Sequence, residues 1–129
     1  MSTIKTETLS TPSNATVPVD TVVNGTAKAW VNFNGTGTVA IRRAFNVASI
    51  TDRGTGKYTV NFITALPDSS YSSQGNGQKA DTGDDGGWVV QVGGYVGGEQ
   101  TASACPVVTG YKTSNTPVDG PANFIAIFS

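Results

Sequence analysis

Residues 27–62 decide the fold, and they read AKAWVNFNGTGTVAIRRAFNVASITDRGTGKYTVNF. Side chains of a β-strand point to opposite faces in turn, so apolar residues at every second position share one face. The first predicted strand has such a set in Ala29, Val31 and Phe33. A later strand has another set in Tyr58, Val60 and Phe62. The stretch is therefore predicted to form strands with one apolar face each.

Two glycine-containing turns separate these strands. Residues 34–37 read NGTG and residues 52–56 read DRGTG. Glycine supplies the positive φ that a tight hairpin turn needs. Between the turns, residues 39–41 begin a further strand that continues towards Phe45 and Val47. The whole stretch is predicted to be an antiparallel meander.

The composition agrees with an all-β protein. The chain has 129 residues, of which 37% are hydrophobic and 13% are charged, and 16 are glycine. Small polar and β-branched residues suit strands and turns, whereas helices favour Leu, Glu, Lys and Ala. We therefore predict an antiparallel β-sandwich or barrel-like domain with no helix longer than about two turns.

The chain divides into an extended N-terminal arm over residues 1–24 and a β-sandwich domain over residues 25–129. Pro12 and Pro18 interrupt regular structure in the arm, and residues 3–9 are predicted to form a short strand. A segment with β-propensity and no core of its own usually orders against another surface. The arm is therefore predicted to order against another surface, with a disordered terminus as the alternative.

Three further strands are predicted after the meander, over residues 88–93, 106–109 and 123–128. Residues 71–87 lack an apolar period and are predicted to form a long exposed loop. The last strand is apolar on both faces, so it should be buried on both sides or lie at a subunit interface. The residues assigned to that interface are Phe124, Ile125, Ile127 and Phe128.

The motif AKAWVNFNGTGTVAI, followed by FNVASITDRGTGKYTVNF and ALPDSSY, resembles a segment of tail-fibre-like and other virion structural proteins of marine bacteriophages, especially those that infect cyanobacteria. The resemblance covers residues 25 to about 71, and the opening STIKTETL is similar to the start of many such proteins. It implies a virion structural protein that functions in host attachment, is generally trimeric and commonly attaches through its N-terminal end. It carries no catalytic residue. Arg42 and Arg43 depart from the pattern, in which a less basic pair is expected.

Within this class a trimeric tail-fibre-like or receptor-binding element competes with a capsid decoration or head-fibre protein. A free carbohydrate-binding module is a further alternative. The expected partners are other copies of the chain, other virion proteins of the tail or capsid, and a host surface glycan. The expected location is the virion, assembled in the host cytoplasm. Locating the protein in capsid and tail fractions separates these alternatives.

Several other classes are excluded by composition. The chain has no histidine, the commonest general base and transition-metal ligand. A net charge of −1 disfavours a nucleic-acid binder, which needs a basic surface. No apolar run reaches transmembrane length, and the polar N-terminus lacks a signal-peptide core. We expect no enzyme activity, no catalytic residue, no cofactor, no metal, no nucleic-acid partner and no membrane insertion.

A ligand or receptor contact is predicted around the loop of residues 71–87. Three aromatic residues near it could stack on sugar rings or simply pack in the sheet, and three carboxylates on it could collect Ca²⁺ or remain solvated, since their spacing matches no known calcium loop. The candidate contact residues are Tyr71, Asp81, Asp84, Asp85, Trp88 and Tyr95.

Overall fold

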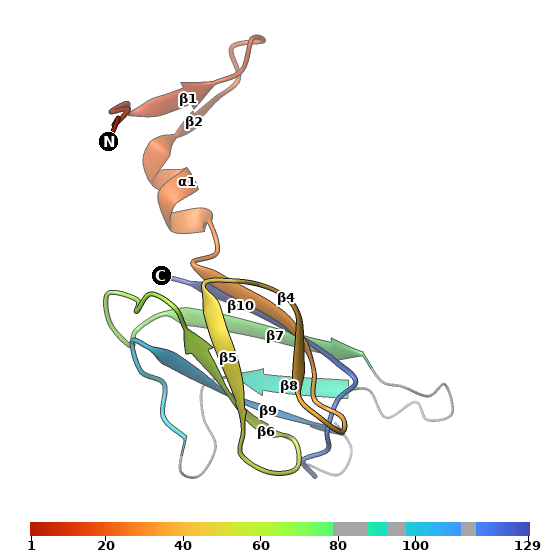
Figure 1. Cartoon of the computed structure of the whole chain (residues 1–129). Helices are drawn as coiled ribbons and strands as arrows, with labels where there is room; N and C mark the ends of the chain where they lie inside the picture. Colours follow the sequence, from red (N-terminus) through yellow and green to blue (C-terminus); the bar gives the residue numbers. More distant parts are fainter. Residues whose placement is uncertain (79–87, 93–97, 112–115) are drawn as a thin grey trace.

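The computed structural model describes residues 1–78, 88–92, 98–111 and 116–129, with the backbone alone for residues 88, 89, 91 and 111. Its arrangement is shown in Figure 1. The elements in chain order are β1 (Thr8–Ser10), β2 (Thr16–Pro18), α1 (Val19–Gly25), β3 (Ala29–Asn34), β4 (Ala40–Phe45), β5 (Val47–Asp52), β6 (Lys57–Phe62), β7 (Ser72–Gln78), β8 (Trp88–Val92), β9 (Ala104–Tyr111) and β10 (Ala122–Phe128).

Two four-stranded antiparallel sheets form the sandwich. The front sheet has the order β4-β3-β10-β7, and the back sheet has the order β5-β6-β9-β8. The predicted all-β sandwich is confirmed, and its strands form two packed sheets rather than a barrel.

Apolar side chains from both sheets meet between them, as the period-two pattern predicts. The alternating residues of β3 and β6 that were assigned to one face are all buried. The core consists of Ala29, Val31, Phe33, Val47, Tyr58, Val60, Phe62, Leu66, Tyr71, Val90, Cys105, Val107, Ile125 and Ile127. The rings of Phe33 and Tyr58 meet edge to face across the two sheets, with centroids 5.1 Å apart.

The predicted meander is wrong, because the chain changes sheets at Asn46. β3 pairs with β4 in the front sheet, whereas β5 pairs with β6 in the back sheet. Asn46 has a φ of 54°, a left-handed conformation that asparagine adopts more readily than most residues. Its side chain donates to the carbonyls of Lys28 and Thr64 at 3.1 Å each. The stretch is therefore two hairpins at a corner.

The two predicted turns have the expected backbone. Gly37 in the β3–β4 turn has a φ of 64°, and Gly54 and Gly56 in the β5–β6 turn have φ values of 108° and 65°. These positive values are those for which glycine carries no steric cost. The turns were correctly predicted even though the pairing between the hairpins was not.

The long loop predicted over residues 71–87 is wrong for its first half. Residues 72–78 form β7, which pairs with β10 at the edge of the front sheet. A Cβ atom on Gly75 would lie 2.6 Å from Cγ1 of Val90, so β7 approaches β8 too closely for any side chain there. The inward face of β7 therefore has glycine at its point of contact with β8. For this reason the sequence of β7 lacks the alternating apolar residues that predict a strand.

Asp119 holds together the turns at one end of the sandwich. Its Oδ1 accepts hydrogen bonds from the Tyr58 hydroxyl and from the Gly56 backbone, both at 2.7 Å. Burial, and then the Asp119 carboxylate, raise the pKa of the Tyr58 hydroxyl above its usual value. Gly35 N also donates to Gly120 O at 2.8 Å. The β3–β4 turn, the β5–β6 turn and the segment before β10 thus share one polar cluster.

The N-terminal arm projects from one end of the sandwich, beside the C-terminus (Figure 1). It is not extended throughout, because α1 follows the β1–β2 hairpin and runs to Gly25. Pro18 occupies the N-cap position of this helix and makes no side-chain hydrogen bond there. The helix has seven residues, in keeping with the predicted upper limit. In the described ranges no helix is long and apolar enough to cross a membrane.

Candidate functional site

The outer face of the front sheet carries large aromatic side chains. Trp30 on β3 and Phe124 on β10 are 38% and 40% exposed. They lie on this face because their neighbours Val31 and Ile125 point into the core. Phe45 of β4 pairs with Trp30 and is 55% exposed on the same face. A group of exposed apolar rings of this kind is typical of an interaction surface.

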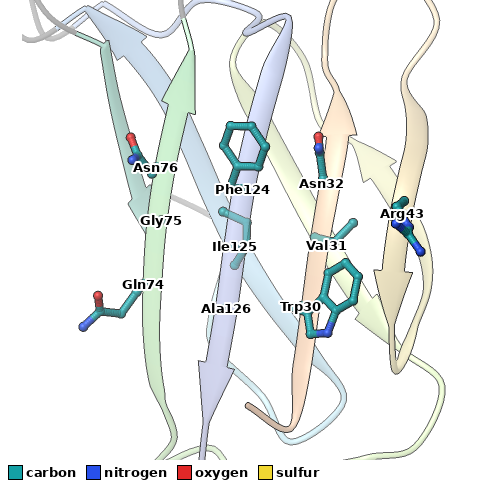
Figure 2. Close-up of a pocket in the computed structure, with 10 residues that line it drawn as sticks. All are labelled: Trp30, Val31, Asn32, Arg43, Gln74, Gly75, Asn76, Phe124, Ile125 and Ala126. Carbon is teal, nitrogen blue, oxygen red and sulfur yellow. The ribbon is translucent and has the colours of Figure 1, made fainter. Parts of the chain in front are cut away.

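The register of the strands places amide side chains beside these rings. Phe124 pairs with Asn32 of β3 on one side and with Asn76 of β7 on the other. Ala126, two residues further along β10, pairs with Trp30 and with Gln74. Directly paired residues of an antiparallel sheet share a face, so the rings and the amides form two adjacent rows. Figure 2 shows these side chains on the three strands.

A hollow of about 680 Å³ lies over these rows. On the outer face, the small residue Ala126 lies between Trp30 of β3 and Gln74 of β7. The residues that line the hollow are Trp30, Val31, Asn32, Arg43, Gln74, Gly75, Asn76, Phe124, Ile125 and Ala126. This volume lies within the range typical of small-ligand sites, about 300–1,000 Å³.

A β-bulge brings arginine to the edge of the hollow. Asn32 pairs with Arg43, but the next residue, Phe33, pairs with Ile41, so Arg42 is the extra residue in β4. Bulges of this kind re-aim side chains and frequently lie next to functional sites. Arg42 Nη1 lies 3.5 Å from Asn32 Oδ1, and Arg43 lines the hollow. The bulge therefore directs two guanidinium groups towards the outer face.

This set of groups is suited to binding a ligand. The ten lining residues include one charged side chain, Arg43, and no carboxylate, histidine or cysteine. These three side-chain types are among those that proton transfer and covalent catalysis use most often. Within the described part of the chain, no group of three or more His, Cys, Asp or Glu side chains could hold a metal ion. Aromatic faces, amides and a guanidinium group offer stacking and hydrogen bonds to a neutral or anionic ligand.

Of the six residues predicted to contact a ligand, Tyr71 is the one whose side chain the structure describes. Tyr71 is 6% exposed, its ring packs edge to face on Phe62, and its hydroxyl donates to Ala104 O at 2.7 Å. Burial raises the pKa of this hydroxyl above its usual range. Tyr71 is therefore a core residue. Trp88 begins β8, and its side chain is outside the description. Asp81, Asp84, Asp85 and Tyr95 also lie outside the described residues.

The four residues assigned to a subunit contact divide between two faces. Ile125 and Ile127 are 3% and 1% exposed and pack in the core of their own chain. No neighbouring subunit is needed to cover them, because β10 lies in the middle of the front sheet between β3 and β7. Phe124 is exposed on the outer face, and Phe128 is half-buried on the same face. Only this outer pair is available for a contact.

Sequence reasoning missed the residues of the hollow, although part of the signal was present. Assigning Ala29, Val31 and Phe33 to the core also assigns Trp30 and Asn32 to the opposite face. A tryptophan on a solvent-facing strand position is such a signal. The contributions of Gln74 and Asn76 depend on β7, which was not predicted.

A second surface with unpaired apolar residues is found in the arm. Val19, Val22 and Val23 share one side of α1, because residues three and four apart in a helix are neighbours. Val22 and Val23 are exposed, and none of the helical residues is buried. Thr26 Oγ1 donates to Val22 O at 2.5 Å, and Lys28 Nζ donates to Val23 O, so the helix end is tied to the start of the sandwich.

Comparison of the chain with protein families, with curated proteins and with solved structures gives no match. The function is therefore inferred from the hollow, from the arm and from the resemblance that residues 25–71 carry.

Proposed function

We propose that the protein is a structural component of a bacteriophage virion, a tail-fibre-like receptor-binding element that assembles as a homotrimer through its N-terminal arm. The observation that carries this proposal is the arm itself. It stands off the sandwich (Figure 1). Its apolar side chains Ile4, Leu9, Val22 and Val23 are exposed. An arm of this kind is suited to docking into a larger assembly.

The stability of α1 supports an assembly role. A helix of seven residues is marginal in water, because isolated helices shorter than about 12–15 residues rarely persist without packing. α1 buries none of its residues and has no side-chain hydrogen bond at its N-terminal cap. Burying the valines of α1 between subunits supplies the missing packing. The helix argues for association, and the resemblance to trimeric virion proteins supplies the threefold symmetry.

The arm and the hollow lie on different parts of the molecule, which supports separate roles for them in assembly and in binding. The arm leaves from the end of the sandwich where β3 begins, whereas the hollow lies on the side of the front sheet. Trimer contacts around the arm therefore leave the outer face of the front sheet accessible. The arm attaches the protein to the virion, and the sandwich presents a face to the host.

Two measurements test this proposal. Mass spectrometry of capsid and tail fractions from purified virions should find the protein with the tail, whereas its presence in the capsid fraction alone would favour a decoration protein. Its absence from virions would refute the structural role.

Light scattering on the purified full-length chain should show a trimer. Val22→Asp should shift it to monomers, because the substitution places a charge in the contact between helices. Thr21→Asp is the matched control, since it adds the same charge on the opposite side of α1 and should leave the trimer intact. A monomeric wild-type protein, or equal effects of both variants, would contradict assembly through α1.

A further inference from the structure

We propose that the hollow on the outer face of the front sheet binds a pyranose that carries a carboxylate, a unit of an acidic surface polysaccharide. This inference deepens the receptor-binding role proposed above and rests on it for its biological meaning. The binding itself is a property of the isolated chain.

The two aromatic rings provide the apolar part of such a site. Trp30 and Phe124 lie on neighbouring strands and are offset by two residues, since Trp30 pairs with Ala126 rather than with Phe124. Cross-strand neighbours on such a diagonal lie about 7–8 Å apart. Ala126 lies across from Trp30 on β10, two residues beyond Phe124, and its side chain is small (Figure 2). One face of a pyranose ring carries C–H bonds and is apolar. This face can pack on an aromatic ring in the same way as an apolar side chain does.

The amide side chains provide the polar part. Asn32 lies beside Phe124 on β3, and Asn76 and Gln74 lie on β7 across β10. An amide offers one acceptor and two donors within a single group, which matches hydroxyl groups that both donate and accept hydrogen bonds. Asn32 and Asn76 flank Phe124 on both sides, and Gln74 lies across Ala126 from Trp30. A sugar stacked on the rings therefore has hydroxyl groups within reach of these amides. Asn32 Oδ1 accepts from Arg42 Nη1 and Asn76 Oδ1 accepts from Gly77 N, so these two amides would offer a ligand their NH2 groups as donors.

The charge at the edge of the hollow selects for an anion. Arg43 lines the hollow and Arg42 lies beside Asn32, while no described lining residue is acidic. A guanidinium group binds a carboxylate through two parallel hydrogen bonds, which are stronger than neutral ones. A neutral sugar would use the rings and the amides but would leave this charge unmatched. The pair Arg42–Arg43, which departs from the family pattern, thus acquires a role.

The experiment measures binding to the full-length protein by titration calorimetry with matched pairs of sugars. A tetragalacturonate is compared with its neutral methyl ester, and sialyllactose is compared with lactose. The first pair tests hexuronic acids and the second tests sialic acids. The acidic member of at least one pair should bind about ten to a hundred times more tightly than the neutral member, as expected for a hydrogen bond to a charged group.

Three variants locate the site. Arg43→Gln should remove the preference for the acidic sugar and leave the affinity for the neutral one unchanged. Arg53→Gln is the matched control, because Arg53 is an exposed arginine of the β5–β6 turn on the back sheet, and both affinities should stay as in the wild type. Trp30→Ala should abolish both. Thermal unfolding of each variant establishes that it is folded.

Several results would overturn the inference. These are equal affinity for the acidic and neutral members of both pairs, the absence of binding at millimolar sugar, and an equal loss of binding in Arg43→Gln and Arg53→Gln. If Trp30→Ala dissociates an oligomer and the wild type binds no sugar, the face is a contact between copies of the chain and the inference is wrong. If the protein binds no sugar, the proposal that it is a virion component still stands. If the protein is absent from virions, a sugar site measured on the purified chain still stands. The two proposals can therefore fail separately.

Discussion

β10 carries isoleucines on the face that points into the sandwich and phenylalanines on the face that points out of it. Ile125 and Ile127 are buried against the back sheet, while Phe124 remains well exposed. Both kinds of residue are large and apolar, so hydrophobicity alone does not distinguish their roles. The inner residues stabilise one chain, whereas Phe124 lies among amides and an arginine in a hollow. The inner face is expected to control the free energy of unfolding, and the outer face is expected to control binding.

The largest expected effect is on the inner face of β10. Ile127→Ala removes a side chain that is almost fully buried and should lower the free energy of unfolding by about 2–5 kcal/mol. Phe124→Ala on the same strand is the control and should change it by about 1 kcal/mol or less, because the ring is already partly in solvent. Chemical denaturation measures both. Equal losses would show that the two faces do not differ in the way described.

The next effect is a loss of stability at alkaline pH, which arises from two tyrosines of the inner face. Unfolded tyrosines lose their proton near pH 10, but burial raises the pKa of Tyr58 and Tyr71 in the folded protein. Below pH 10 both states are protonated and the stability is unaffected. Above pH 10 the folded state holds more protons than the unfolded state, so stability falls as pH rises. Each tyrosine contributes a slope of about 1.4 kcal/mol per pH unit.

Tyr58→Phe tests the assignment of this slope. It removes one of the two titrating groups, so the slope above pH 10 should fall by about half. It also removes the hydrogen bond to Asp119, so the stability at neutral pH should be lower than that of the wild type. Urea denaturation at a series of pH values measures both quantities. An unchanged slope would show that Tyr58 does not hold its proton in the folded state.

The smallest of the three effects is on β7. Gly75→Ala places a methyl group 2.6 Å from Val90 Cγ1 and should destabilise the sandwich by about 1–3 kcal/mol through overpacking. Gly25→Ala is the control, because a Cβ at Gly25 meets nothing within 4 Å. Thermal unfolding compares the two. If Gly75→Ala is as stable as the control, β7 and β8 are not as close as the structure places them.

Sequence reasoning correctly predicted the strands whose buried positions carry large apolar side chains. β3 and β6 alternate large apolar residues with polar ones, and their faces were assigned correctly. β7 has its own alternation, but its inward positions are Ser73, Gly75 and Gly77. Small residues can fill an inward face as closely as large ones when the facing sheet approaches it. A hydrophobicity scale gives these residues low values, so it does not identify such a strand as buried.

Two local conformations were beyond sequence reasoning for a different reason. The corner between the sheets depends on one residue, Asn46, whose left-handed backbone is stabilised by contacts to Lys28 and Thr64 that only the folded chain brings near. The bulge at Arg42 depends on how β4 pairs with β3. A tryptophan facing outward could be predicted from the alternation in β3. Its amide and guanidinium neighbours could not, because they come from pairing between strands far apart in the sequence.

The arm and the end of the chain leave the sandwich from adjacent strands, and this has a mechanical consequence. Lys28 N donates to Ile127 O at 2.7 Å, and Ala29 pairs with Ile127 in the next rung. A force that pulls the arm away from the C-terminus loads these rungs one at a time and peels β10 from β3. A force between the arm and a surface held at Trp30 is carried by the covalent backbone instead, because Trp30 is the second residue of β3 and follows closely after the arm. The sandwich is thus compliant between its ends and stiff from the arm to the hollow.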